Sequence, residues 1–128
     1  MQKFTNIRVW HRSHQLTIAI LRATETFPAR YRFSITQQLE RAIASVPTNL
    51  AEGSKAESPD DYARYINICE KSLAEAQYLL ILHRDLGHLS ETLETQFQKE
   101  AAGIARQLHA LKQSVRHNND QRFDASTF

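Results

Sequence analysis

Residues 58–87, SPDDYARYINICEKSLAEAQYLLILHRDLG, decide the fold because they predict one long helix with two apolar stripes at helical spacing. The first stripe consists of Tyr62, Ile66, Cys69, Leu73, Ala76 and Leu80, and the second of Tyr65, Ile68, Ser72, Leu79, Leu82 and Leu86. A helix on the surface of a monomer needs a single stripe. Two stripes predict a helix covered over much of its circumference, at the centre of a bundle or against a second subunit.

The ends of this helix are equally clear in the sequence. Ser58 is a typical N-cap, Pro59 suits the first helical position, and two aspartates follow in the first turn, where carboxylates complement the helix dipole. Gly87 is a typical helix end. Ser90 is then the predicted cap of a final helix over residues 90–117, which carries a heptad seam. That seam consists of Phe97, Ala101, Ile104, Leu108, Leu111 and Val115.

Two more helices precede the long one. Residues 7–26 carry an apolar stripe that ends before Pro28. Residues 34–53 are the second helix: Ser34 and Gln37 predict a capping box, and Gly53 a left-handed C-cap. Pro47 lies inside this helix and cannot donate to the carbonyl four residues before it, so it predicts a kink or a short irregular turn.

Together these segments predict an all-α protein, an antiparallel up-down-up-down four-helix bundle with short connections. Its 128 residues, with three Gly and three Pro, suit one domain over residues 1–117, followed by a mobile polar tail at residues 118–128. Cys69 is the single cysteine, so an intramolecular disulfide is excluded, and a cytoplasmic protein is expected. Its position on an apolar stripe predicts a core residue. The first residues lack the apolar region of a signal peptide, and no apolar run is long enough to span a membrane.

Charge is distributed unevenly along the chain. The first 45 residues hold seven cationic and two anionic side chains, whereas residues 46–100 hold five cationic and ten anionic ones. The candidate phosphate-binding residues are Arg8, Arg12 and Arg22 of the first helix and Arg30 and Arg32 of the connection after it. This basic half favours anion binding, although attraction between subunits or a solvated surface without a special partner would explain it too.

Three apolar residues, Trp10, Ile18 and Leu21, widen the apolar face of the first helix and predict a subunit interface. Polar residues inside the later helices predict a structural network that joins two helices or two subunits. The members of this network are Arg41, Asn49, Glu52, Ser72 and Glu75. The alternative interpretation is a polar functional site at the end of the bundle.

The sequence contains no arrangement typical of a catalytic or metal centre. A di-metal carboxylate bundle needs Glu-x-x-His pairs, and no Glu has His three residues later; a Gly-rich phosphate loop and a Gly-x-Ser-x-Gly elbow are also missing. We therefore expect no catalytic residues, no metal and no cofactor. An enzyme using Glu52 and Glu75 is the weaker alternative, because no nucleophile or metal set accompanies them.

Several short motifs, in this order and spacing, carry a family resemblance. They are Phe4, Val9-Trp10, Phe27-Pro28, residues 41–45 (RAIAS), residues 49–53 (NLAEG) and residues 72–75 (SLAE). The chain resembles the bacterial four-helix-bundle family of proteins encoded in intervening sequences of large-subunit ribosomal RNA genes and of accessory variability proteins of diversity-generating retroelements. Where the family has Ile before the Asn, this chain has Val46-Pro47-Thr48, and Lys71 replaces a Gly before the Ser-Leu pair.

The resemblance covers about residues 4–115 and implies a bundle that assembles as a barrel-like homopentamer. For the retroelement members it also implies a basic surface that binds nucleic acid and a reverse transcriptase. We therefore expect a non-enzymatic oligomeric scaffold whose partners are further copies of itself, RNA or DNA, and a nucleic-acid-processing protein. The alternative hypothesis is a protein-protein interaction module without a nucleic-acid role.

Overall fold

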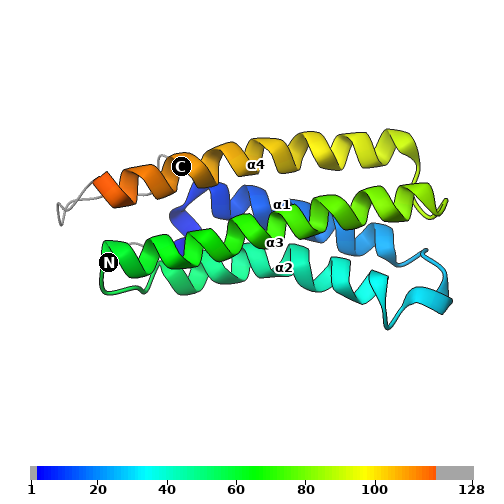
Figure 1. Cartoon of the computed structure of the whole chain (residues 1–128), viewed down its shortest axis with the longest axis horizontal. Helices are drawn as coiled ribbons and strands as arrows, with labels where there is room; N and C mark the ends of the chain where they lie inside the picture. Colours follow the sequence, from blue (N-terminus) through cyan, green and yellow to red (C-terminus); the bar gives the residue numbers. More distant parts are fainter. Residues whose placement is uncertain (1–2, 118–128) are drawn as a thin grey trace.

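The computed structural model describes residues 3–117, and within that range all regular structure is helical. Four long helices lie side by side along the long axis of the molecule (Figure 1), and each begins at the end of the bundle where the previous one stops. They are α1 (Arg8–Thr24), α2 (Ile35–Gly53), α3 (Pro59–Asp85) and α4 (Glu91–His117), with short 3-10 turns η1 (Phe4–Asn6) and η2 (Ala29–Tyr31). The all-α prediction is confirmed. The predicted tail at residues 118–128 lies outside the described residues.

Helix α3 packs against both α2 and α4, and α1 closes the bundle by contacting the same two helices. The first stripe of α3 is buried from Ile66 to Leu80, and the predicted seam of α4 is buried throughout, so both patterns are confirmed as core. The second stripe of α3 is covered less completely: Leu79 is buried, Ile68 is half-buried and Leu86 is 44% exposed. A single chain therefore leaves part of the second stripe open.

Pro47 lies inside α2 without interrupting it, so the predicted irregular turn does not form. Because a proline has no amide hydrogen, the carbonyl of Ile43 lacks its usual backbone donor. The hydroxyl of Thr17 in α1 donates to that carbonyl at 3.3 Å while also bonding to the carbonyl of Ser13 at 2.8 Å. The indole Nε1 of Trp10 donates to the Pro47 carbonyl at 3.2 Å. Side chains of α1 therefore satisfy the backbone around the proline.

The helix caps follow the sequence in two places and differ in a third. The hydroxyl of Ser58 accepts the amide of Asp61 at 3.1 Å, and the hydroxyl of Ser90 accepts the amide of Leu93 at 3.1 Å, as predicted. At Ser34 the predicted capping box is absent, since its hydroxyl donates back to a carbonyl three residues earlier. The tight turn after η2 provides that acceptor before α2 begins, so the side chain does not reach the helix.

Gly53 has a different role from the predicted left-handed cap. Among the described residues only Gly87 has a positive φ, at 81°, whereas Gly53 is the buried last residue of α2. A Cβ at Gly53 would lie 2.8 Å from Cβ of Tyr65 in α3. Position 53 therefore requires glycine because α2 and α3 approach closely there, and not because of its backbone angles.

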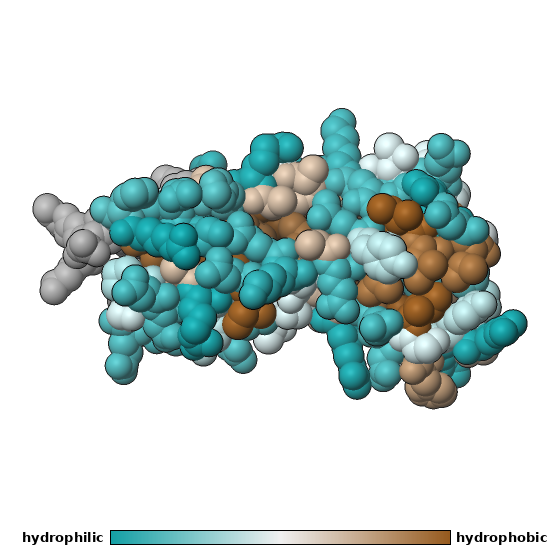
Figure 2. Space-filling view, in the orientation of Figure 1, coloured by the Kyte–Doolittle hydropathy of each residue, from teal (hydrophilic) through white to brown (hydrophobic). Residues whose placement is uncertain are grey.

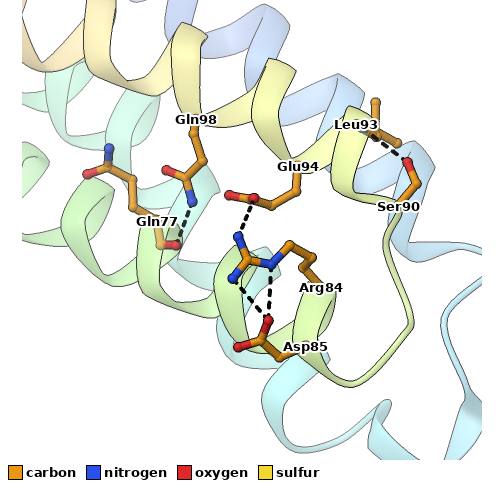
Figure 3. A network of polar contacts seen from close by, with 7 residues as sticks. All are labelled: Gln77, Arg84, Asp85, Ser90, Leu93, Glu94 and Gln98. Atoms are coloured by element: carbon orange, nitrogen blue, oxygen red, sulfur yellow. Dashed lines mark hydrogen bonds and ion pairs between the residues drawn. The ribbon is translucent and has the colours of Figure 1, made fainter.

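The end of the bundle between α3 and α4 is fastened by ion pairs (Figure 3). The guanidinium of Arg84 donates to Glu94 at 2.9 Å and also pairs with Asp85 at 3.0 Å. The Glu94 carboxylate is buried, and Arg84 supplies its counter-charge. One turn further along, the side-chain amide of Gln98 donates to the backbone carbonyl of Gln77 at 2.9 Å. These contacts fix α4 against the last turns of α3.

Candidate nucleic-acid interface

Four of the five arginines predicted to contact phosphate are exposed. They are Arg8 and Arg22 of α1, Arg30 of η2, and Arg32 directly after η2. Arg8 and Arg22 lie two heptads apart on nearly the same face, which separates them by about 21 Å along the helix axis. Within residues 3–117 none of the four pairs with a carboxylate, and Arg30 lies over the Tyr31 ring at 5.5 Å. Their charges are therefore available to an outside anion.

Arg32 differs from the other three in its surroundings. It lines a hollow of about 310 Å³ that Glu25 and Glu40 also line. The hydroxyl of Thr24 donates to Glu40 at 2.8 Å, which holds that carboxylate in place. The two carboxylates offset part of the positive potential near Arg32. Arg8, Arg22 and Arg30 are consequently the better candidates for phosphate contacts.

Arg12, the fifth predicted residue, is part of the fold. Its guanidinium forms a close ion pair with Glu100 of α4 and donates to the side-chain oxygen of Gln107 at 3.2 Å. A Cβ on Gly103 would lie within 2.6 Å of three guanidinium atoms of Arg12, so this glycine makes room for the arginine. Because α1 and α4 use the charge and donors of Arg12, its predicted phosphate contact is less favoured than those of the four exposed arginines, and it stays a prediction.

Of the three residues predicted for a subunit interface, Trp10 packs within its own chain, whereas Ile18 and Leu21 are partly exposed. Trp10 is half-buried, stacks on His14 with 4.9 Å between ring centroids, and meets the edge of Phe4 at 5.0 Å. It therefore anchors the N-terminal segment within its own chain. Ile18 is half-buried, and Leu21 is 37% exposed. An interface between subunits through these residues stays a prediction.

Exposed apolar side chains gather in one half of the bundle. The large ones are Leu21, Phe33, Tyr78, Ile81 and Leu86, which lie in the half that holds the α1–α2 and α3–α4 connections. Figure 2 shows a hydrophobic area at this end of the molecule. Phe33 is 81% exposed, which is unusual for a phenylalanine. This end therefore offers a second surface for a partner.

The predicted polar network is smaller in the single chain than expected. Its charged members are Arg41, Glu52 and Glu75. All three are exposed, and they form no hydrogen bond or ion pair within residues 3–117, because the single chain leaves their faces of α2 and α3 uncovered. The amide of Asn49 donates to the Ser45 hydroxyl at 2.9 Å, and that hydroxyl lies 2.9 Å from the Ser72 hydroxyl. Of the predicted network, these serine and asparagine side chains are the part that joins α2 to α3 within residues 3–117; a network between subunits stays a prediction.

Cys69 is buried in the core, and its thiol donates to the carbonyl of Val46 at 3.3 Å. Burial raises the pKa of this thiol to about 12, so it is protonated and unreactive at neutral pH. Burial of Tyr62, together with the nearby Cys69, raises the pKa of the Tyr62 hydroxyl to about 12.

In the described part of the chain no three His, Cys, Asp or Glu side chains are grouped to hold a metal ion. None of the described helices is long and apolar enough to cross a membrane.

Residues 5–110 match the family of 23S rRNA-intervening sequence proteins. The chain belongs to this family. The matched range begins in η1 and ends in α4, so it takes in the two exposed arginines of α1 and both of those at η2. No curated protein matches the sequence.

A solved structure supports the fold of this family member. It is the crystal structure of a protein of unknown function from the S23 ribosomal protein family of Bacteroides thetaiotaomicron, with a TM-score of 0.76. The likeness covers 81% of this chain and 97% of the other, at 20% sequence identity. At that identity the likeness shows the shared fold alone.

Sequence reasoning missed one group of polar residues in this 23S rRNA-intervening sequence protein. His83 is fully buried, and its ring centroid lies 4.6 Å from that of Phe27. Its Nδ1 lies 3.0 Å from Nδ1 of His88. The signal was present, because His83 continues the first stripe of α3 three residues beyond Leu80. Burial lowers the pKa of His83, so the buried ring is neutral near pH 7.

Proposed function

We propose that this 23S rRNA-intervening sequence protein is a non-enzymatic scaffold that binds nucleic acid through the exposed arginines of α1 and η2. The observation that carries the proposal is the difference between Arg12, which Glu100 neutralises, and Arg8, Arg22 and Arg30, which no carboxylate neutralises within residues 3–117. A guanidinium that the fold does not use can form two parallel hydrogen bonds to a phosphate. Arg32 contributes less to the positive potential of this surface, because Glu25 and Glu40 lie near it.

The family name supports RNA as the nucleic acid. It refers to intervening sequences of 23S ribosomal RNA, and in this chain that connection is a proposal about the partner and not about a reaction. Such a partner would be met in the cytoplasm. Phosphate contacts are independent of sequence, so we expect affinity for structured RNA in general, with a strong dependence on salt.

Assembly would strengthen a weak basic surface. We propose that the up-down-up-down bundle forms a barrel-like homopentamer, supported by the open part of the second α3 stripe, including Ile68 and Leu86. Repeating the exposed arginines in each subunit would turn several weak contacts into one tight one. Sedimentation should give a mass close to five times the 14.8 kDa of the chain. A monomer mass across the accessible concentration range would refute this assembly.

The experiment that tests the nucleic-acid proposal compares two double variants with equal charge loss. Arg8→Gln with Arg22→Gln removes two proposed contacts, and Arg106→Gln with Arg116→Gln removes two exposed arginines of α4. Binding of a fluorescent RNA hairpin is measured by anisotropy on nuclease-treated protein. We expect the α1 variant to weaken binding and to reduce the slope of log K against log salt by about 2, whereas the α4 variant changes little.

Equal losses in both double variants would mean that only net charge attracts the RNA, and unchanged affinity in the α1 variant would refute the proposed surface. A DNA duplex of the same sequence serves as a second ligand. Tighter binding of the RNA would favour recognition of the A-form helix or its hydroxyls over the phosphate charge alone.

The exposed apolar end supports a second candidate function, a module that docks another protein. Its strongest single feature is Phe33, at 81% exposure. We expect a Phe33→Ser variant to lose a protein partner that survives nuclease treatment in a pull-down from the native host, while RNA affinity is retained. If every captured protein disappears with nuclease, the scaffold binds nucleic acid and the docking function is excluded.

A further inference from the structure

The turn after α3 brings two histidines together in a defined way. The amide of Gly87 donates to the carbonyl of Arg84 at 2.9 Å, and the amide of His88 donates to the carbonyl of His83 at 2.9 Å. With the positive φ of Gly87, these two bonds make a Schellman cap. In such a cap the side chains at the positions of His83 and His88 touch, and this contact is usually between two apolar residues. Here it is between two imidazoles, which can be charged by protons.

The hydrogen bonds fix the protonation pattern of the pair. Nε2 of His83 lies 3.3 Å from the backbone carbonyl of Ile35 at the start of α2. A carbonyl only accepts, so Nε2 of His83 carries the hydrogen and its Nδ1 has a free lone pair. Nδ1 of His88, 3.0 Å away, must then be the donor to Nδ1 of His83. The cap is therefore held by a directional bond from the half-buried ring to the fully buried ring.

The surroundings of the pair are aromatic. From the α1–α2 connection, the ring of Phe27 contacts both imidazoles, and the ring of Tyr31 lies 5.0 Å from that of His88, with Arg30 over the tyrosine. From α2, the backbone carbonyl of Ile35 forms a hydrogen bond with His83. The charges nearest along the chain, on Arg84 and Asp85, are engaged in an ion pair that also includes Glu94 of α4. Within residues 3–117 no carboxylate bonds to either imidazole, so no counter-charge is in contact with a proton bound there.

These features make Nδ1 of His83 the acid-sensitive atom. A proton bound there removes the lone pair that accepts the bond from His88 and meets the hydrogen of His88, whose Nδ1 is 3.0 Å away. We propose that the His83–His88 pair is an acid-sensitive latch: a proton on Nδ1 of His83 breaks the bond from His88, opens the α3–α4 cap and frees η2 while the rest of the bundle stays folded.

Opening would change the surface that carries the proposed RNA contacts, because Tyr31 of η2 packs against His88 and Arg30 lies over that tyrosine. The latch itself is independent of the proposed function, since its test uses no RNA. Its pH dependence has a clear sign. Burial lowers the pKa of His83, so the closed cap is fully stable above the ordinary histidine range and loses stability as the pH falls through the lowered value.

The test is amide hydrogen exchange combined with imidazole titration by NMR, on the full chain between about pH 7.5 and about pH 4.5. A chelator is present so that no divalent ion competes with the protons. The reporters are the amides of Gly87 and His88, which form the cap, and the amides of Ile66 and Leu108, which lie in the core. We expect the cap amides to lose protection by up to about tenfold per pH unit as Nδ1 of His83 is protonated, and the core amides to keep theirs.

Two variants separate the latch from general acid sensitivity. In His88→Asn the side-chain amide can donate to neutral His83 or accept from protonated His83, so the cap should stay closed at pH values where the wild type opens. The matched control, His109→Gln, removes an exposed histidine of α4 and should open like the wild type.

Three results would overturn the proposal. They are cap amides that stay protected after His83 is protonated, core amides that lose protection together with the cap, and a His88→Asn variant that opens at the wild-type pH. If His88→Asn does not fold, the first two results, obtained on the wild type, still decide.

Discussion

Replacing Thr17 with valine removes the only side-chain hydroxyl that donates to the Ile43 carbonyl among the described residues. Pro47 leaves this carbonyl without a backbone donor, and the residues around it are buried. Valine has nearly the shape of threonine, so the change deletes a hydrogen bond with little change in packing. A buried acceptor without a partner costs about 1 to 3 kcal/mol. We expect the free energy of unfolding to fall by about 1.5 kcal/mol, because the hydroxyl is shared with the Ser13 carbonyl.

The assay is urea denaturation followed by far-UV circular dichroism, with Thr48→Val as the matched control. Thr48 is exposed on α2 and its hydroxyl bonds only to a carbonyl of its own helix, so the control should change stability by less than about 0.5 kcal/mol. A double-mutant cycle then tests the reason. In a Pro47→Ala background the backbone amide at position 47 supplies the missing donor, and the effect of Thr17→Val should shrink by about 1 kcal/mol. An equal effect in both backgrounds would refute the reasoning.

Three further predictions concern packing, charge and reactivity. Gly53→Ala should lower the free energy of unfolding by about 1 to 3 kcal/mol in urea denaturation, because its Cβ meets Cβ of Tyr65 at 2.8 Å and neither atom can rotate away. Arg84→Ala should lower the urea midpoint in the same assay, since the carboxylate of Glu94 is buried and loses its counter-charge; an unchanged midpoint would show that solvent already screens that carboxylate. With its pKa raised to about 12, the thiol of Cys69 should react with a disulfide reagent at about pH 8 only at the rate of unfolding, and a fast stoichiometric reaction of the folded protein would contradict its burial.

Local signals in the sequence predicted local structure well. Ser58 and Ser90 cap α3 and α4 because the hydroxyl and the amide that it accepts are three residues apart, so both ends of the bond are visible in one short stretch. Gly87 takes the positive φ that the end of a helix favours. Ser34 shows the limit, since a cap motif can be outcompeted by another nearby carbonyl, here that of Tyr31.

Contacts between distant residues could not be predicted in the same way. Arg12 and Glu100 are 88 positions apart, and nothing near either residue indicates the other, so Arg12 resembled the free arginines beside it. Gly53 carries the same ambiguity: its role depends on Tyr65 of the neighbouring helix, whereas the sequence shows only a glycine at a helix end. Four of the five arginines of the candidate site are therefore exposed, and the fifth takes part in a tertiary ion pair.

The most direct test of the central claim is the salt dependence of RNA binding by the nuclease-treated wild-type protein. If exposed arginines bind phosphates, log K for a structured RNA must fall linearly with log salt, with a slope that counts several contacts, and this slope must decrease when Arg8 and Arg22 are replaced. No binding at low salt, or binding that is insensitive to salt, would contradict the claim and leave the exposed apolar end as the functional surface.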